Sequence, residues 1–278
     1  MSAVEQFLIW LEGTMPLPTM FSLFHLLAIM IVTIVTYIVA TQYKNATEKQ
    51  LRTILLLVGI TTLSFEAYKQ LVFSYSFDAS TNLSSWSYQW YAFPFHFCSI
   101  PMYIAPIAAF LRPGKVRQAI LNFLGTFGLF GGLAVMIYAQ PVFITTIGIN
   151  IQTMVHHGAQ VLLGVFLITS GRVEMNLKAM KGATIVFIIP VLMAVAMNII
   201  FYAINATNLG EFNMFWISPY FPTDLPILSA IKPQVPYPLF VLIYIVGFTF
   251  IATLVLSLAI ALRKIKCASL QKRRKVAE

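Results

Sequence analysis

Seven long apolar runs constrain this chain more than any other feature of its sequence. They cover roughly residues 20–42, 51–73, 93–111, 118–138, 150–170, 183–205 and 238–262. A helix of about 20 apolar residues is long enough to cross the hydrocarbon core of a bilayer. The runs are continuous and do not alternate, which argues against a membrane β-barrel. We therefore expect an all-α polytopic membrane protein, in which one seven-helix domain occupies residues 1–278.

The composition excludes two other classes of protein. Hydrophobic residues make up 59% of the 278 residues, and charged residues only 10%. A soluble domain has about 25% charged residues, and a disordered chain is polar throughout. The formal net charge is +9, but the basic residues stand in small groups and no soluble module presents them. We therefore expect no nucleic-acid partner.

The positions of the basic residues predict the orientation of the spans. Segments 43–52, 112–117, 171–182 and 263–278 together hold 16 of the 18 Lys and Arg residues. The positive-inside rule places these segments in the cytoplasm, with the N-terminus outside and the C-terminus inside. The tail over 263–278 is thus a topology anchor, and it could also bind anionic lipid head groups.

Polar side chains within the spans gather at one depth. With this topology, the outer third of the membrane holds His25, Glu66, Lys69, His96, Cys98, Gln152, His156, His157, Gln160 and Asn198. Ionisable groups inside a bilayer are costly, and they usually face a cavity and serve a function. We therefore predict a polar pocket that opens outward. The alternative is a set of separate interhelical hydrogen bonds, with Glu66 and Lys69 paired along their own helix.

The stretch Phe-Pro-Phe-His-Phe-Cys-Ser-Ile-Pro over residues 93–101 is the most unusual in the chain. Pro94 suits a helix start, and Pro101 removes a helical hydrogen bond, so the backbone beside Cys98 should be kinked. His96 and Cys98 stand two residues apart, about 200° around a regular helix, and do not face each other.

The fifth run offers a better partner for Cys98. Its Gln152, His156 and Gln160 follow one another at four-residue spacing and share one helix face, while His157 lies about 100° away. A cysteine thiolate activated by a nearby histidine is a strong nucleophile. The alternative for Cys98 is a small, buried apolar residue without a chemical role.

Three short motifs resemble a known family. They are Phe21-Ser-Leu-Phe-His25-Leu-Leu, Pro94-Phe-His96-Phe-Cys98-Ser99 and His156-His157-Gly158. Together they resemble the YwaF-like bacterial integral membrane proteins, which are related to the animal transmembrane protein 164 acyltransferases. The resemblance implies a bacterial plasma membrane location, transfer of fatty acyl groups between lipids, and Cys98 as nucleophile with His157 as its partner.

Topology and resemblance together predict a lipid transacylase or a lipid hydrolase. A thiolate in the outer third does not readily reach cytoplasmic acyl-CoA, so the acyl donor would be a membrane lipid. His157 or His156 would move the proton, and His96 would orient or relay it. A side chain such as Asn198 or Gln152 would hold the oxyanion. We expect no cofactor and no bound metal, since no ligand spacing such as HExxH is present.

Two functions without catalysis fit the same sequence. A transporter or binding protein for a small amphiphile would line its site with His25, Glu66, His96 and His156, and could couple transport to protons through histidine. A structural membrane subunit would have packed polar side chains and no cavity. For an enzyme or a transporter, the proline- and aromatic-rich outer loop 206–237 is a predicted lid.

Overall fold

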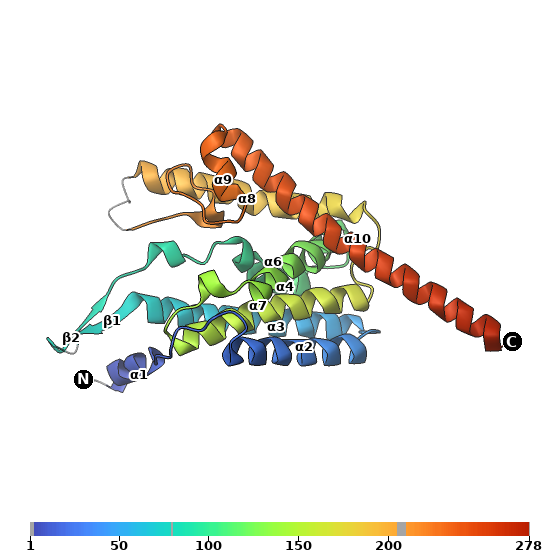
Figure 1. Ribbon diagram of the computed structural model, residues 1–278, viewed down its shortest axis with the longest axis horizontal. Helices are drawn as coiled ribbons and strands as arrows, with labels where there is room; N and C mark the ends of the chain where they lie inside the picture. The colour runs from blue at the N-terminus through green and yellow to red at the C-terminus, as the bar shows by residue number, and fades with distance from the viewer. Residues whose placement is uncertain (1–2, 79, 205–209, 278) are drawn as a thin grey trace.

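The computed structural model describes residues 3–78, 80–204 and 210–277, with the side chains at 266, 267 and from 270 onward outside the description. The helices are α1 (Ala3–Leu11), α2 (Leu23–Gln42), α3 (Glu48–Ser74), α4 (Ile100–Phe110), α5 (Lys115–Phe123), α6 (Leu129–Ile137), α7 (Ile147–Thr169), α8 (Ala179–Ala203), α9 (Leu228–Ile231) and α10 (Tyr237–Ala277). A π turn over Leu124–Gly128 joins α5 to α6 without a break. The described chain is therefore mostly helical, with one short hairpin and several irregular segments (Figure 1).

Among the described residues, six helical stretches are long and apolar enough to cross a membrane. They are α2, α3, Lys115–Ile137, α7, α8 and the Tyr237–Ile265 part of α10. Each coincides with one of the predicted runs to within a few residues. The predicted helical membrane protein is thus confirmed for six of the seven runs.

The third predicted run, 93–111, forms a shorter helix than expected. A 3-10 turn at Phe97–Ser99 leads into α4, so only Phe97–Phe110 is helical. Pro94 lies in irregular chain before this turn, and it is Pro101 that occupies the first turn of α4, where a missing N–H has no helical partner to lose. The helix start predicted at Pro94 is therefore wrong, although the backbone beside Cys98 is irregular as expected.

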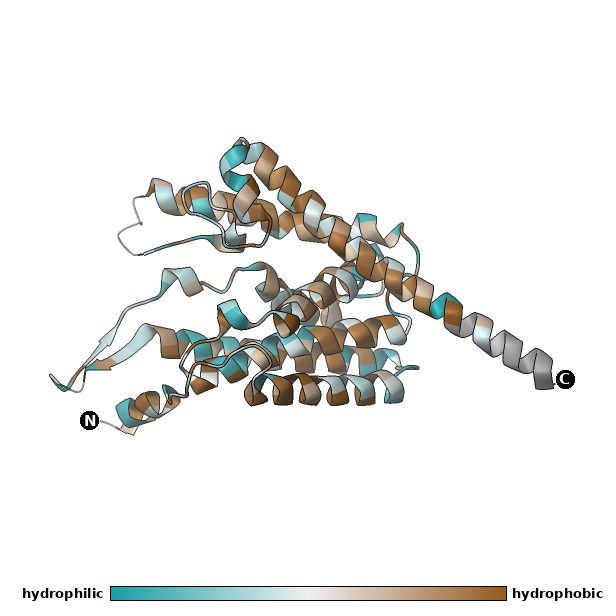
Figure 2. Ribbon diagram, in the orientation of Figure 1, coloured by the Kyte–Doolittle hydropathy of each residue, from teal (hydrophilic) through white to brown (hydrophobic). Residues whose placement is uncertain are grey.

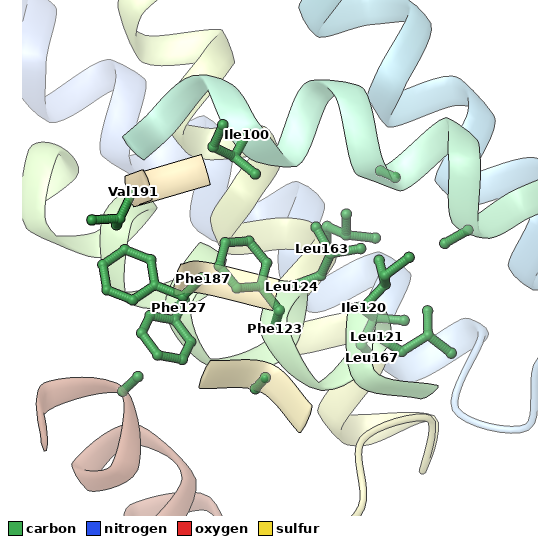
Figure 3. Close-up of a cluster of buried hydrophobic side chains, with 14 of the residues drawn as sticks. Ile100, Ile120, Leu121, Phe123, Leu124, Phe127, Leu163, Leu167, Phe187 and Val191 are labelled. Atoms are coloured by element: carbon green, nitrogen blue, oxygen red, sulfur yellow. The ribbon is translucent and has the colours of Figure 1, made fainter. Parts of the chain in front are cut away.

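The helix α7 lies at the centre of the bundle. It packs against α2, α3 and α6, while α4 packs on α3 and α8 packs on α5 (Figure 1). Aromatic rings fill the space between these helices: Phe127 stacks on Phe123 at 5.3 Å and on Phe187 at 4.7 Å between ring centroids (Figure 3). Leu163 and Leu167 of α7 belong to the same buried cluster, so α7 packs against this core (Figure 3).

Apolar side chains also cover the outside of the molecule. On α2, large residues such as Leu26, Met30 and Ile34 are about half exposed, and α8 and α10 present similar faces (Figure 2). Patches of this extent mark contact with lipid or with other proteins. Together with the six apolar helices, they indicate an integral membrane protein.

Two elements at the N-terminal end were not predicted. The helix α1 precedes the first span, and the strands β1 (Tyr75–Asp78) and β2 (Leu83–Trp86) form an antiparallel hairpin after α3. In the hairpin turn, hydrogen bonds from Ser80 and then Thr81 lower the pKa of Asp78 to about 2. Both elements lie far from the C-terminal end of α10 (Figure 1).

Candidate functional site

Cys98 lies in the first turn of the short helical run and is half-buried. The irregular chain before it is held by the Tyr103 hydroxyl, which donates to the Pro94 carbonyl at 2.7 Å. The Cys98 carbonyl accepts two hydrogen bonds from α7, from His156 Nε2 and from Gln160 Nε2, both at 2.9 Å. The structure thus brings two members of the predicted α7 stripe directly to the cysteine.

The bond from Nε2 to the Cys98 carbonyl defines the tautomer of a neutral His156 ring. A carbonyl only accepts, so Nε2 must carry the hydrogen and Nδ1 of the neutral ring keeps a lone pair. That Nδ1 atom is buried and has no hydrogen-bond partner among the described residues, and the same holds for Gln160 Oε1. The side chains that donate to the Cys98 carbonyl therefore each also present an unoccupied acceptor atom.

His157 has a similar lone pair but a different attachment. Its Nδ1 donates to the Thr153 carbonyl of its own helix at 2.8 Å, which leaves a buried Nε2 without a partner in the described chain. The His156 and His157 ring centroids are 5.3 Å apart. The resemblance implied that His157 is the partner of Cys98, but the hydrogen bonds connect His156 to the cysteine residue.

An ion pair between a buried glutamate and a half-buried lysine interacts with these groups. Glu66 Oε1 is 2.8 Å from Lys69 Nζ and accepts a hydrogen bond from Gln70 at 2.7 Å. The predicted pairing of Glu66 with Lys69 along α3 is therefore present. Both charges interact electrostatically with His96, Cys98 and His156.

Gln70 is a further residue of this region that the sequence patterns did not single out. It also donates to the Ala92 carbonyl at 2.8 Å and so ties α3 to the chain that leads to Cys98. Gln70 stands four residues after Glu66, and residues four apart on a helix are neighbours. This spacing is the sequence pattern that would have identified Gln70.

His96 stands between the cysteine turn and the outer loop. Its Nε2 lies 3.4 Å from the Tyr91 carbonyl, and its buried Nδ1 has no partner among the described groups. The ring lies 5.6 Å from Trp216, and the neighbouring Phe215 packs on Phe95 at 5.8 Å. The described part of the outer loop therefore covers the segment that precedes Cys98.

The outer loop is more ordered than the predicted, unstructured lid over 206–237. Its residues 206–209 lie outside the described chain, and the rest contains α9 and two 3-10 turns, Met214–Trp216 and Lys232–Gln234. Phe215 and Trp216 both have positive φ, at 58° and 59°, which costs of order 1–2 kcal/mol for each residue. Such a conformation persists only where surrounding contacts hold it.

Asn198 and Lys232 supply two of those contacts. The buried Asn198 amide donates to the Met214 carbonyl at 3.0 Å and accepts from the Met214 N–H at 2.8 Å. Lys232 donates to the Ser218 and Phe221 carbonyls, and its burial lowers its pKa. Asn198 was expected to hold an oxyanion. Instead, its side-chain carbonyl and one amide hydrogen bind the backbone of the outer loop.

Substitution of Asn198 by alanine should loosen this loop. The loss of two buried hydrogen bonds leaves the Met214 N–H unpaired, at a cost of about 1–3 kcal/mol. The Met214 carbonyl keeps only the longer bond from the Ile217 N–H at 3.3 Å. We expect faster hydrogen exchange across residues 212–218, measured by mass spectrometry. Met193→Ala, on the exposed face of the same helix, is the control and should leave exchange there unchanged. Equal exchange in the Asn198 variant and the unmodified protein would contradict the anchoring role.

Two other predicted site residues lie apart from the cysteine. His25 is fully buried, accepts from the Phe21 N–H at 3.0 Å and donates to the Met136 carbonyl at 2.9 Å, so both ring nitrogens have partners. Gln152 is buried and accepts a long bond from Thr153 at 3.5 Å. Among the described contacts, neither side chain bonds to the Cys98 segment.

The described His, Cys, Asp and Glu side chains were compared with the arrangement that a metal site needs. No group of three or more His, Cys, Asp and Glu residues is placed to share a metal ion within the described part of the chain. The histidine lone pairs near Cys98 are instead suited to accept protons or hydrogen bonds.

Comparison with known proteins gives one match. The model of the TMEM164 family matches residues 18–260, a range that includes Cys98, all four histidines and most of the helical bundle. No curated protein and no solved structure matches the chain.

Proposed function

Because this chain belongs to the TMEM164 family, we propose that it is an integral membrane enzyme that transfers fatty acyl groups between membrane lipids. Membership of this family is consistent with an acyltransferase-like role in the membrane. The observation that carries the finer proposal is the pair of hydrogen bonds from His156 and Gln160 to the Cys98 carbonyl. They attach a candidate base to the backbone of the proposed nucleophile.

The proposed topology has seven membrane segments, with the N-terminus outside. The run Phe97–Phe110 is the short seventh segment, and an odd count agrees with the basic loops in the cytoplasm. Cys98 then lies in the outer half of the membrane, near the level of lipid ester groups. The acyl donor would be a phospholipid of that leaflet.

In the first half-reaction, His156 Nδ1 takes the thiol proton and the Cys98 thiolate attacks an ester carbonyl carbon. A C–S bond forms, the ester C–O bond breaks, and the departing lysolipid oxygen takes the proton from His156. The Cys98 carbonyl stabilises the charged imidazole through its bond to Nε2. The described contacts contain no hydrogen bond to Nδ1, and catalytic hydrogen bonds often tighten only when substrate binds.

The position of Cys98 changes the expected source of oxyanion stabilisation. A side chain was expected to hold the oxyanion because a helix interior offers no free N–H. Cys98 lies in the first turn of its helical run, and its own N–H precedes the first bond of that turn, from the Ser99 N–H to the His96 carbonyl at 2.8 Å. The helix dipole at this end favours negative charge. We assign thiolate and oxyanion stabilisation to this helix start.

In the second half-reaction, an acceptor hydroxyl loses its proton to His156 and attacks the thioester. The new ester forms, the C–S bond breaks, and the thiolate recovers the proton from the imidazole. Water in place of the lipid hydroxyl would make the protein a hydrolase.

His96 relays protons or orients the acceptor, and its ring lies 5.6 Å from that of Trp216 in the outer loop. The outer loop acts as a lid that limits the access of water.

Capture of the thioester tests this proposal. Purified protein is incubated with phosphatidylcholine that carries an isotope-labelled acyl chain, and its intact mass is measured before and after hydroxylamine. We expect a hydroxylamine-sensitive acyl adduct on the unmodified protein. The chain has only two cysteines, so Cys267→Ser is a matched control and should keep the adduct. The proposal would be contradicted if the Cys98→Ser variant still formed a hydroxylamine-sensitive thioester adduct.

A further inference from the structure

A second polar region lies at the end of the bundle opposite Cys98. Two adjoining cavities of about 390 and 260 Å³ open there and share Gly114, Gln118 and Glu174 in their walls. The walls come from the starts of α3, α5 and α8 and from the loop between α7 and α8. Ligand pockets in proteins span about 300–1,000 Å³, so the larger cavity has room for a small polar group.

The walls of these cavities carry more positive than negative charge. Lys115 and Lys178 line the larger cavity, and Arg117 and Arg172 line the smaller one. The described ion pairs of the protein do not include Lys115 or Lys178. Two lysine charges are therefore available to a ligand in the larger cavity.

The two carboxylates in the walls are already engaged. Glu48 lies 2.6 Å from the buried Arg117 and 3.5 Å from Arg172. Glu174 accepts from the buried Asn122 amide at 3.0 Å, a bond that leaves its negative charge in place. The arginines therefore offset Glu48, and in the wall of the larger cavity Lys115 and Lys178 outnumber Glu174.

The backbone adds donors of the same kind. The helical stretch Lys115–Ile137 begins at Gly114, and its first backbone bond runs from Gln118 N–H to the Gly114 carbonyl at 2.9 Å. The N–H groups of the three residues between them precede this bond and have no helical partner, and the N-cap residue is a glycine, which has no side chain to cap them. A helix N-terminus of this kind binds phosphate through its free N–H groups and its dipole.

The level of the cavities in the membrane indicates where the anion comes from. The apolar spans α3 and α8 and the stretch from Lys115 begin here, and α7 ends here, so the cavities lie at a membrane interface. Basic pockets between membrane helices at that level bind lipid head groups. We propose that the larger cavity binds the phosphate of an anionic phospholipid, held by Lys115, Lys178 and the start of α5.

This inference does not depend on the acyl-transfer proposal. The site lies at the far end of the bundle from Cys98, and its ligand need not be a substrate. The shared chemistry is a phosphate group, which a free phosphate could also supply, so the test includes both sources.

Native mass spectrometry of the full-length protein in detergent tests the site. Phosphatidylglycerol and phosphatidylcholine are titrated separately, and the unmodified protein should bind phosphatidylglycerol more tightly. A basic residue near an anionic lipid contributes about fivefold in affinity, so Lys115→Gln combined with Lys178→Gln should weaken phosphatidylglycerol binding about 25-fold. Lys181→Gln, an exposed residue of the same region outside both cavities, is the matched control and should bind as the unmodified protein does.

Three results would overturn the inference. One is equal phosphatidylglycerol binding in the double variant, and another is an equal loss in the control. The third is displacement of the lipid by millimolar inorganic phosphate, which would assign the site to a soluble phosphate. Thermal unfolding of each variant distinguishes loss of the site from loss of the fold.

Discussion

Replacement of His156 by alanine should lower acyl transfer by about 10²–10⁴-fold, the range that a general base contributes. His156 donates to the Cys98 carbonyl at 2.9 Å and keeps an unoccupied, buried Nδ1. Both properties are lost in the alanine variant. The measurement is the rate of transfer of a labelled acyl chain between lipids in proteoliposomes, with substrate well above KM.

The neighbouring histidine is the matched control. His157 is bonded to Thr153 of its own helix, so His157→Ala should lower the rate by less than about tenfold. His156→Gln separates two roles, because glutamine can still donate to the Cys98 carbonyl but cannot take the thiol proton. We expect its thermal stability to match the unmodified protein while its activity matches His156→Ala. An inactive His157→Ala variant together with an active His156→Ala variant would indicate that His157, and not His156, is the base.

Introduction of a single methyl group at Gly59 should destabilise the bundle by about 1–3 kcal/mol. Gly59 of α3 faces Pro106 of α4, and a Cβ atom built there would lie 2.2 Å from Cγ and 2.5 Å from Cδ of the proline ring. A proline ring cannot rotate away, because it is closed on its own backbone. The two helices must therefore separate, and other contacts between α3 and α4 weaken with them.

Gly247 provides the control for this substitution. It also lies within an apolar helix, α10, but a Cβ atom there would meet no described residue within 4 Å. Gly247→Ala should leave stability unchanged or raise it by up to about 1 kcal/mol, as helix propensity predicts. Thermal unfolding in detergent, followed by intrinsic fluorescence, compares the two variants. A Tm for Gly59→Ala equal to that of Gly247→Ala would contradict the close contact of α3 with α4.

The helices could be located in advance because hydropathy is a local property of the chain. Each apolar run either is or is not long enough to span a bilayer, whatever its neighbours do. The run at 93–111 is the instructive exception. Its composition is apolar throughout, but Pro94 and Pro101 compete for the helix start, and local rules alone favoured the first. In the structure, the bonds of Tyr103 and of α7 to this segment accompany the later start at Phe97.

The partners of the polar residues could not be predicted in the same way. Which side chain meets Cys98 depends on the rotation and depth of α7 relative to α4, and these are decided by packing between helices. Gly132 of α6 is part of that packing, since a Cβ atom there would lie 2.7 Å from the His157 carbonyl. Similarly, Asn198 has the depth expected of a pocket residue, but the fold of the outer loop engages it with Met214.

By itself, the sequence therefore determined that this is a helical membrane protein, where its long spans lie, and which polar groups those spans contain. The tertiary structure decided that His156 and Gln160 hold the Cys98 residue, that His25 bonds elsewhere, and that a basic cavity forms between α5 and α8. The reason is physical. Burial of apolar surface in a bilayer acts on each helix alone, whereas contacts between side chains arise only when the helices take their places against one another.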